Sequence, residues 1–140
     1  MSGKVIESLY REVEREPYAR KLGLKLVEAG PGLAVVEMDP GEDTGNIFGM
    51  LHGGAIFSLM DEAFEVSCNA HGTVAVALSM SLVYHRAPNM NGRLRAESRE
   101  IHKGRKTATY EIKVTDQSGA LVASCQALAY RKGTPLPFLE

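Results

Sequence analysis

Residues 46–71 constrain the fold of this chain more than any other stretch of its sequence. A loop leads through His52-Gly53-Gly54 into the longest helix-compatible run. At about 100° per residue, one half of a helical wheel is apolar and holds Ile56, Phe57, Leu59, Met60, Ala63, Phe64, Val66 and Ala70. The other half holds Ser58, Asp61, Glu62, Glu65 and Asn69. The pattern predicts a long helix that ends before Gly72 and buries one face, with Glu62 and Glu65 as surface or interface charges.

The rest of the chain is dominated by strand patterns. Strands are expected over residues 24–29, 33–38, 74–84, 93–103, 107–115 and 120–131, joined mostly by turns rich in Gly, Asn and Asp. A short amphipathic helix begins near Val5 and should end at Pro17, while Pro135 and Pro137 make the tail a poor candidate for either element. Strands joined by tight turns predict an antiparallel sheet. We therefore expect a single α+β domain over residues 1–140, with a curved sheet of five to six strands wrapped around the long central helix.

Composition excludes several classes of protein. Hydrophobic residues make up 44% of the chain, which argues against disorder, and a net charge of −1 argues against a nucleic-acid partner. The two cysteines, Cys68 and Cys125, lack a metal-binding spacing and suit a reducing compartment. The N-terminus is too charged for a signal peptide, and no apolar run approaches the ~20 residues of a membrane span. We expect a soluble cytoplasmic protein with no membrane partner.

The start of the central helix can bind a negatively charged or carbonyl oxygen. Gly53 and Gly54 are poor residues for a helix interior, but at a first turn they allow a ligand to approach unpaired backbone N–H groups. A tight loop-to-helix turn without a ligand explains the same pair. For Asp61 alone, a solvated helix carboxylate is the default interpretation, and a catalytic acid or base is the alternative.

Several motifs together resemble one family. The motifs are Asn46-x-x-Gly49-x-x-His52-Gly53-Gly54, an aspartate at position 61, the strand Ala77-Leu78-Ser79-Met80-Ser81-Leu82-Val83-Tyr84 and the later His102-Lys103-Gly104-Arg105. In this order and spacing, they resemble the hotdog-fold acyl-CoA thioesterases, and the PaaI-like (phenylacetic acid degradation) branch in particular. The resemblance covers nearly the whole chain, from about Pro17 to Arg131.

The resemblance implies roles for five catalytic candidates. Asp61 would be the general base or the nucleophile, and Asn46 would contact the thioester or the attacking water. Gly53 would present its N–H to the thioester oxygen, in a loop shaped by His52. Ser79 lies where some members carry a hydroxyl that orients water. Other members carry Ser or Thr one helical turn after the carboxylate, but this chain has Glu65 there, which favours Ser79.

The resemblance also implies contacts with coenzyme A, at Gly54 and in the segment His102, Lys103, Gly104 and Arg105. Residues 93–106 hold six basic and two acidic side chains, and such a basic excess suits a polyphosphate. A solvated strand edge that discourages aggregation explains any one of these charges equally well.

The spacing of the candidate residues predicts an oligomer. His52 and Gly53 precede Asp61 by nine and eight residues, which places them about 12–13 Å apart along one helix and on nearly opposite sides. They cannot close on one substrate from the same chain. If both halves are catalytic, the site is shared between subunits of at least a homodimer. The resemblance further implies a homotetramer built as a dimer of dimers.

The leading hypothesis is an enzyme that hydrolyses acyl-CoA or aryl-acetyl-CoA thioesters, with no metal and no cofactor apart from the coenzyme A of its substrate. The hydratase branch of the same superfamily carries a histidine five residues after the aspartate, where this chain has Val66. A non-catalytic acyl-CoA-binding hotdog module is the alternative, and binding without turnover would favour it. The sequence leaves the acyl group, the pathway, the tetramer arrangement and the choice between base and nucleophile undetermined.

Overall fold

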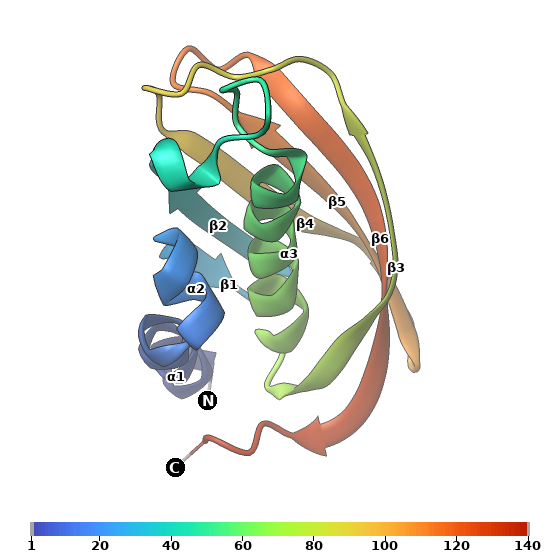
Figure 1. Cartoon of the computed structure of the whole chain (residues 1–140). Coiled ribbons are helices and arrows are strands. Elements are labelled where there is room, and N and C mark those ends of the chain that lie inside the picture. Colours follow the sequence, from blue (N-terminus) through green and yellow to red (C-terminus); the bar gives the residue numbers. More distant parts are fainter. Residues whose placement is uncertain (1, 140) are drawn as a thin grey trace.

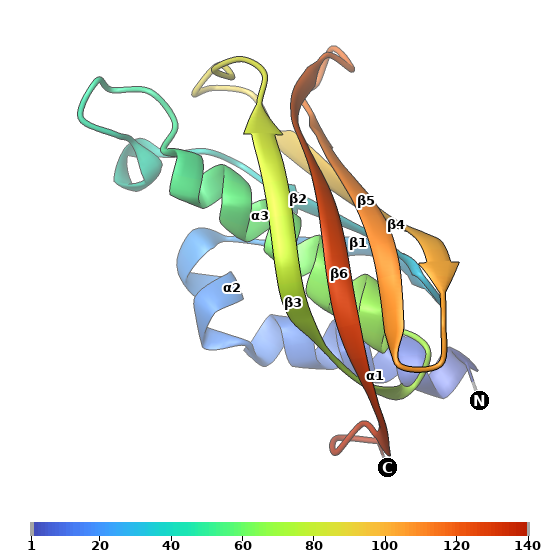
Figure 2. The same cartoon turned by 90° about the vertical axis from the view of Figure 1, so that its right-hand side faces the viewer.

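A computed structural model describes residues 2–139, so residues 1 and 140 of the expected domain lie outside the described part. The elements follow in the order α1 (Ser2–Arg15), α2 (Pro17–Leu22), β1 (Lys25–Gly30), β2 (Leu33–Met38), η1 (Glu42–Thr44), α3 (Gly53–Asn69), β3 (Thr73–Tyr84), β4 (Leu94–Lys103), β5 (Thr107–Thr115) and β6 (Leu121–Pro135). The six strands form one antiparallel sheet in the order β1-β2-β4-β5-β6-β3. Figures 1 and 2 show this sheet curving around α3. The predicted architecture of a long helix wrapped by an antiparallel sheet is confirmed.

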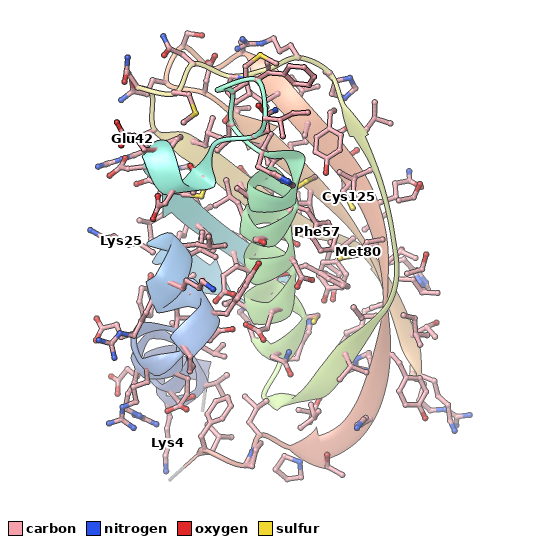
Figure 3. All side chains as sticks on the ribbon, in the orientation of Figure 1. Lys4, Lys25, Glu42, Phe57, Met80 and Cys125 are labelled. Atoms are coloured by element: carbon pink, nitrogen blue, oxygen red, sulfur yellow. The ribbon has the colours of Figure 1, made fainter. Side chains whose placement is uncertain are left out.

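The core lies between α3 and the inner face of the sheet. Leu59, Met60, Ala63 and Phe64 of α3 are each at most 1% exposed, and they pack with alternate buried residues of β4 and β5. Such alternation follows from the two-residue period of a strand, which turns every second side chain inward. On the other side of the helix, Phe57 and Met80 are only half-buried and lie between α3 and β3 (Figure 3).

The N-terminal segment holds one helix more than expected. The first helix, α1, ends at Arg15, just before Pro17, as expected, but Pro17 is also the first residue of a second helix, α2. Proline suits that position because its missing N–H would have no partner in a first turn. The two short helices lie on the side of α3 away from β3 and β6 (Figures 1 and 2). A hydrogen bond of 2.8 Å between the hydroxyls of Tyr18 and Ser58 joins α2 to α3.

The last strand also differs from the expectation, because β6 continues to Pro135. Its neighbour β5 begins at Thr107, opposite Tyr130, whereas β3 still pairs with β6 at Pro135 through Thr73. Residues 132–135 therefore need hydrogen bonds on one side only, and proline is tolerated where a strand has one free side.

Candidate active site

The loop before α3 is organised by Asn46. Its side-chain oxygen accepts hydrogen bonds from the N–H groups of Phe48 at 2.8 Å and Met50 at 3.0 Å. The loop that it shapes projects Ile47, 92% exposed, and Phe48, 75% exposed, into solvent. The oxygen of Asn46 is thus occupied by its own loop, and its amide NH₂ is the group available to a thioester or a water.

His52 is the N-cap of α3, and its Nδ1 accepts a hydrogen bond of 2.7 Å from the N–H of Gly54. An accepting Nδ1 means that the neutral ring carries its proton on Nε2. The amides of Ala55 and Ile56 donate to the carbonyl of His52. The N–H groups of Gly54, Ala55 and Ile56 thus all have acceptors. The N–H of Gly53 has none among residues 2–139. Of the two glycines, Gly53 therefore presents the open donor at the positive end of the helix.

Close packing explains why both positions are glycine. A Cβ on Gly53 would lie 3.1 Å from the Tyr84 ring, and one on Gly54 would lie 2.9 Å from Nδ1 of His52. Tyr84 also donates a hydrogen bond of 2.9 Å to the carbonyl of Gly53. Our sequence reasoning did not assign Tyr84 to the site. Its position at the end of a strand gives no signal, since its contact with Gly53 spans 31 residues.

Asp61 lies in the middle of α3 and is half-buried. Burial raises the pKa of its carboxyl, and the nearby negative charge of Glu16 raises it further. One unbroken helix connects Asp61 to Gly53. Within one chain, the structure therefore keeps these two candidates apart, as their spacing predicted.

Ser79 lies on β3, an edge strand of the sheet, and is exposed. The pairing of β3 with β6 is irregular between Ala77 and Ser79, so the side-chain alternation changes there. Large apolar side chains of this strand are well exposed, among them Val76 at 39%, Leu78 at 57% and Tyr84 at 50%. This edge presents apolar side chains beside the exposed Ser79.

The basic segment forms the β4–β5 hairpin, at the end of the molecule away from the start of α3 (Figures 1 and 2). His102, Lys103 and Arg105 are exposed, and Gly104 closes the turn by donating its N–H to the carbonyl of Thr107 at 2.8 Å. Arg131, which sequence reasoning missed, supports the turn through hydrogen bonds from its guanidinium to the carbonyls of Gly104 and Arg105, at 3.0 and 3.3 Å. One chain thus does not bring this hairpin together with His52 and Gly53.

Part of the basic excess is neutralised locally. Arg93 pairs with Asp39 at 2.8 Å and with Glu37 at 3.6 Å, and Arg99 pairs with Glu97. The charges that remain available for a polyphosphate are therefore concentrated at the tip of the hairpin.

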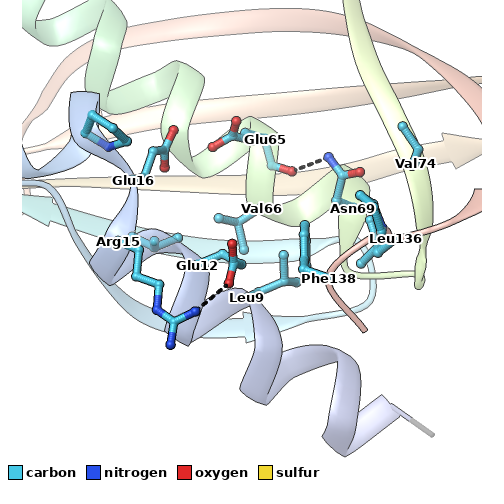
Figure 4. Close-up of a pocket in the computed structure, with 13 residues that line it drawn as sticks. Leu9, Glu12, Arg15, Glu16, Glu65, Val66, Asn69, Val74, Leu136 and Phe138 are labelled. Atoms are coloured by element: carbon cyan, nitrogen blue, oxygen red, sulfur yellow. Dashed lines mark hydrogen bonds and ion pairs between the residues drawn. The ribbon is translucent and has the colours of Figure 1, made fainter. Parts of the chain in front are cut away.

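Glu62, expected as a surface or interface charge, is instead buried within its own chain. Glu62 is only 4% exposed and Ser58 only 6%, because α2 and the junction before it cover this face of α3. Glu65 is exposed and, together with Glu16, lines a cavity of about 440 Å³ between α1, α3 and the C-terminal residues (Figure 4). The wheel pattern could not show this, since it assigns polar residues to solvent without knowing which segments cover them.

Comparison with known proteins defines the class. The family model of the Thioesterase superfamily matches residues 48–123, which span the start of α3, Asp61 and most of the sheet. The chain belongs to the Thioesterase superfamily, and it is a thioester hydrolase with the hotdog fold.

Within the superfamily, the chain is similar to the PaaI proteins. It is 31% identical to the acyl-coenzyme A thioesterase PaaI of Escherichia coli K12 over 133 residues, 95% of each chain. The solved structure of E. coli PaaI superimposes with a TM-score of 0.90, at 30% identity, over 96% of this chain and 98% of the other. A single-residue mutant of the phenylacetic acid degradation protein PaaI from Thermus thermophilus gives a TM-score of 0.79, at 36% identity, over 83% of this chain and 99% of the other.

A third neighbour was solved with a ligand. A Streptococcus mutans UA159 protein bound to acetyl CoA gives a TM-score of 0.77, at 26% identity, over 81% of this chain and 91% of the other. In the described part of the present chain, no helix is long and apolar enough to cross a membrane.

Proposed function

We propose that this protein hydrolyses acyl-CoA thioesters to a free acid and coenzyme A, in a site shared between two subunits. The observation that carries this proposal is the open N–H of Gly53 at the start of α3, in a chain of the Thioesterase superfamily. The similarity to the acyl-coenzyme A thioesterase PaaI and to a protein bound to acetyl CoA supports acyl-CoA as the substrate class.

The chemistry of thioester hydrolysis needs an oxyanion donor and a carboxylate. The Gly53 N–H would stabilise the negative charge that develops on the thioester oxygen as the carbonyl carbon becomes tetrahedral. The Asp61 carboxylate would accept a proton from the attacking water or attack the carbon itself. With Asp61 as the base, the C–S bond then breaks, and the coenzyme A thiolate leaves and takes up the proton that Asp61 removed from water. With Asp61 as the nucleophile, breaking the C–S bond leaves a mixed anhydride on Asp61, which water then hydrolyses to the free acid and the Asp61 carboxylate, and the proton released goes to the thiolate. The amide NH₂ of Asn46 and the hydroxyl of Ser79 are available to orient the thioester or the water.

The distance between Gly53 and Asp61 calls for a second subunit. The apolar edge of β3 and the exposed loop residues Ile47 and Phe48 are surfaces that a partner copy could bury. A two-fold dimer across this edge would bring the helix start of one chain to the middle of α3 of the other. The homotetramer implied by the resemblance would add a second such dimer.

The basic hairpin would contact the phosphates of coenzyme A. Lys103 and Arg105 are exposed at its tip, and His102 precedes them. Positive charge at an exposed turn attracts a polyphosphate without requiring a deep pocket.

The test is thiol release from a panel of aryl-acetyl and aliphatic acyl-CoAs by the wild type and by Asp61→Asn. We expect turnover by the wild type and a loss of about 10²–10⁴-fold in kcat in the variant, because amides are poor bases and nucleophiles. Asp43→Asn, an exposed carboxylate in η1, is the matched control and should keep full activity. Acyl-CoA binding without turnover by the wild type would instead favour a non-catalytic binding module, and equal turnover by wild type and Asp61→Asn would exclude Asp61.

A further inference from the structure

Three carboxyl groups from two separate regions meet beside the cavity of Figure 4. Glu16 comes from the junction between α1 and α2, whereas Glu62 and Glu65 lie on successive turns of α3. One carboxylate oxygen of each lies within 4.8 Å of the others. Figure 4 shows the side chains of Glu16 and Glu65 pointing toward each other.

Among residues 2–139, no group outside the cluster compensates its charge. Glu62 is only 4% exposed, and within these residues its Oε2 has no hydrogen-bond partner. No ion pair, and no hydrogen bond donated from outside the cluster, reaches the carboxylate oxygens of the three residues. Arg15 is near in sequence, but it pairs with Glu12 and its side chain is 69% exposed. A buried, unpaired carboxylate such as that of Glu62 is costly, and two more carboxylates beside it add to the cost, so this arrangement needs a positive counterpart.

That counterpart is either protons or a metal ion. The surrounding side chains keep water from part of each carboxyl group, and this desolvation, with the hydrogen bonds and negative charges of the neighbouring carboxyl groups, raises the pKa of Glu62 and also that of Glu65, although the Glu65 side chain is partly exposed. Two features favour a metal ion over protons alone. A third acidic side chain shares the same space, and the adjoining cavity of about 440 Å³ gives an ion and its waters a route to the cluster.

We propose that Glu16, Glu62 and Glu65 bind an oxygen-preferring divalent cation, Ca²⁺ in the first place, which fastens the α1–α2 junction to α3. Ca²⁺ takes six to eight oxygen ligands at about 2.3–2.6 Å, so two ligand oxygens on opposite sides of the ion are about 5 Å apart. The observed separation of at most 4.8 Å lies within that span. Carboxylates can each supply one or two of these oxygens, and water from the cavity can supply the rest.

The role of this ion is structural. It contacts the turn of α3 that follows Asp61 and would hold in place the segment that covers Glu62 and Ser58. The proposal does not depend on the hydrolytic reaction, and binding can be measured without any substrate.

The test is calcium titration of the chelator-treated protein, measured by calorimetry and by thermal melting, at about pH 8, where calcium has fewer protons to displace from the carboxyl groups than at lower pH. We expect saturable binding and a rise of several degrees in the melting temperature of the wild type. Glu62→Gln and Glu65→Gln should each weaken the affinity at least about tenfold. Glu12→Gln removes a carboxylate from the same cavity but not from the cluster, so it is the matched control and should bind like the wild type.

Unfolding of the variants should not account for their weaker calcium binding. Removing one charge from an uncompensated cluster should leave the calcium-free melting temperature equal or higher, so Glu62→Gln and Glu65→Gln remain folded proteins for the titration. No binding by the wild type, or equal binding by the wild type and both cluster variants, would overturn the proposal and assign shared protons to the cluster.

Discussion

At the scale of single residues, two neighbouring glycines at the start of α3 have different tasks. The N–H of Gly54 is held by the ring of His52, whereas the N–H of Gly53 has no acceptor among residues 2–139. Tyr84 then packs against Gly53 and binds its carbonyl, which fixes the direction of the open N–H. Only the glycine with the free donor can serve as the oxyanion site.

If the unpaired N–H of Gly53 stabilises the oxyanion, two substitutions at Gly53 should have different effects on kcat. Gly53→Pro deletes the N–H but suits the first position of a helix, and the extended backbone of His52 is compatible with a following proline. Gly53→Ala adds the same Cβ near Tyr84 and keeps the N–H, so it controls for packing. We expect kcat of Gly53→Pro to fall about 10²–10³-fold below that of Gly53→Ala in the thiol-release assay, with unchanged helix content by circular dichroism. Equal kcat in the two variants would mean that the oxyanion is stabilised elsewhere.

At the scale of elements, a polar cluster fastens the end of α3 to the sheet. Nε2 of His71, just after the helix, hydrogen-bonds Oε1 of Glu100 on β4 at 2.8 Å, and the hydroxyl of Tyr110 on β5 donates to the same oxygen at 3.0 Å. The Tyr110 ring also packs edge-on against Phe64 of α3, with ring centroids 5.3 Å apart. The helix is therefore held to two strands at the end opposite to Gly53.

Tyr110→Phe tests this cluster, because it removes the hydroxyl and keeps the ring contact. Tyr110 is 1% exposed and its acceptor is a carboxylate, so we expect a loss of about 1.5–3 kcal/mol in the free energy of unfolding by urea. Tyr130 is the control: it is half-buried, and within residues 2–139 its hydroxyl makes no hydrogen bond, so Tyr130→Phe should change stability by less than about 0.5 kcal/mol. If Tyr110→Phe is as stable as Tyr130→Phe, the cluster does not stabilise the fold.

The elements also show what a sequence can and cannot predict. Local patterns predicted α3 and all six strands, because the period of apolar residues follows directly from helix and strand geometry. They missed α2 and the burial of Glu62. Both follow from the packing of residues 16–22 over α3, and these residues are 40 or more positions before the α3 residues that they cover. The extension of β6 to Pro135 was missed for a similar reason, because the neighbouring strand that makes proline acceptable there is not visible locally.

At the scale of the whole molecule, the candidate site is incomplete in one chain. The order of the motifs identified Asn46, Gly53 and Asp61 as candidates, and the fold places Gly53 at the start and Asp61 in the middle of one unbroken helix. It also places the basic hairpin at the far end from the helix start (Figure 2). Gly53, Asp61 and the basic hairpin, which the proposed reaction needs together, are thus separated within one chain. Assembly with a second copy could bring them together.

Mixing two inactive variants provides a direct test of the shared site. In a hybrid dimer of Asp61→Asn and Gly53→Pro chains, a shared arrangement pairs the intact Asp61 of one chain with the intact Gly53 of the other. One of the two sites is then restored, so hybrids purified through two different affinity tags should regain about half of the wild-type kcat. If each site belonged to one chain, both sites of every hybrid would stay defective and no activity would return. Each variant alone, carried through the same mixing and purification, gives the background, and a fully active monomer in sedimentation would contradict the shared site independently.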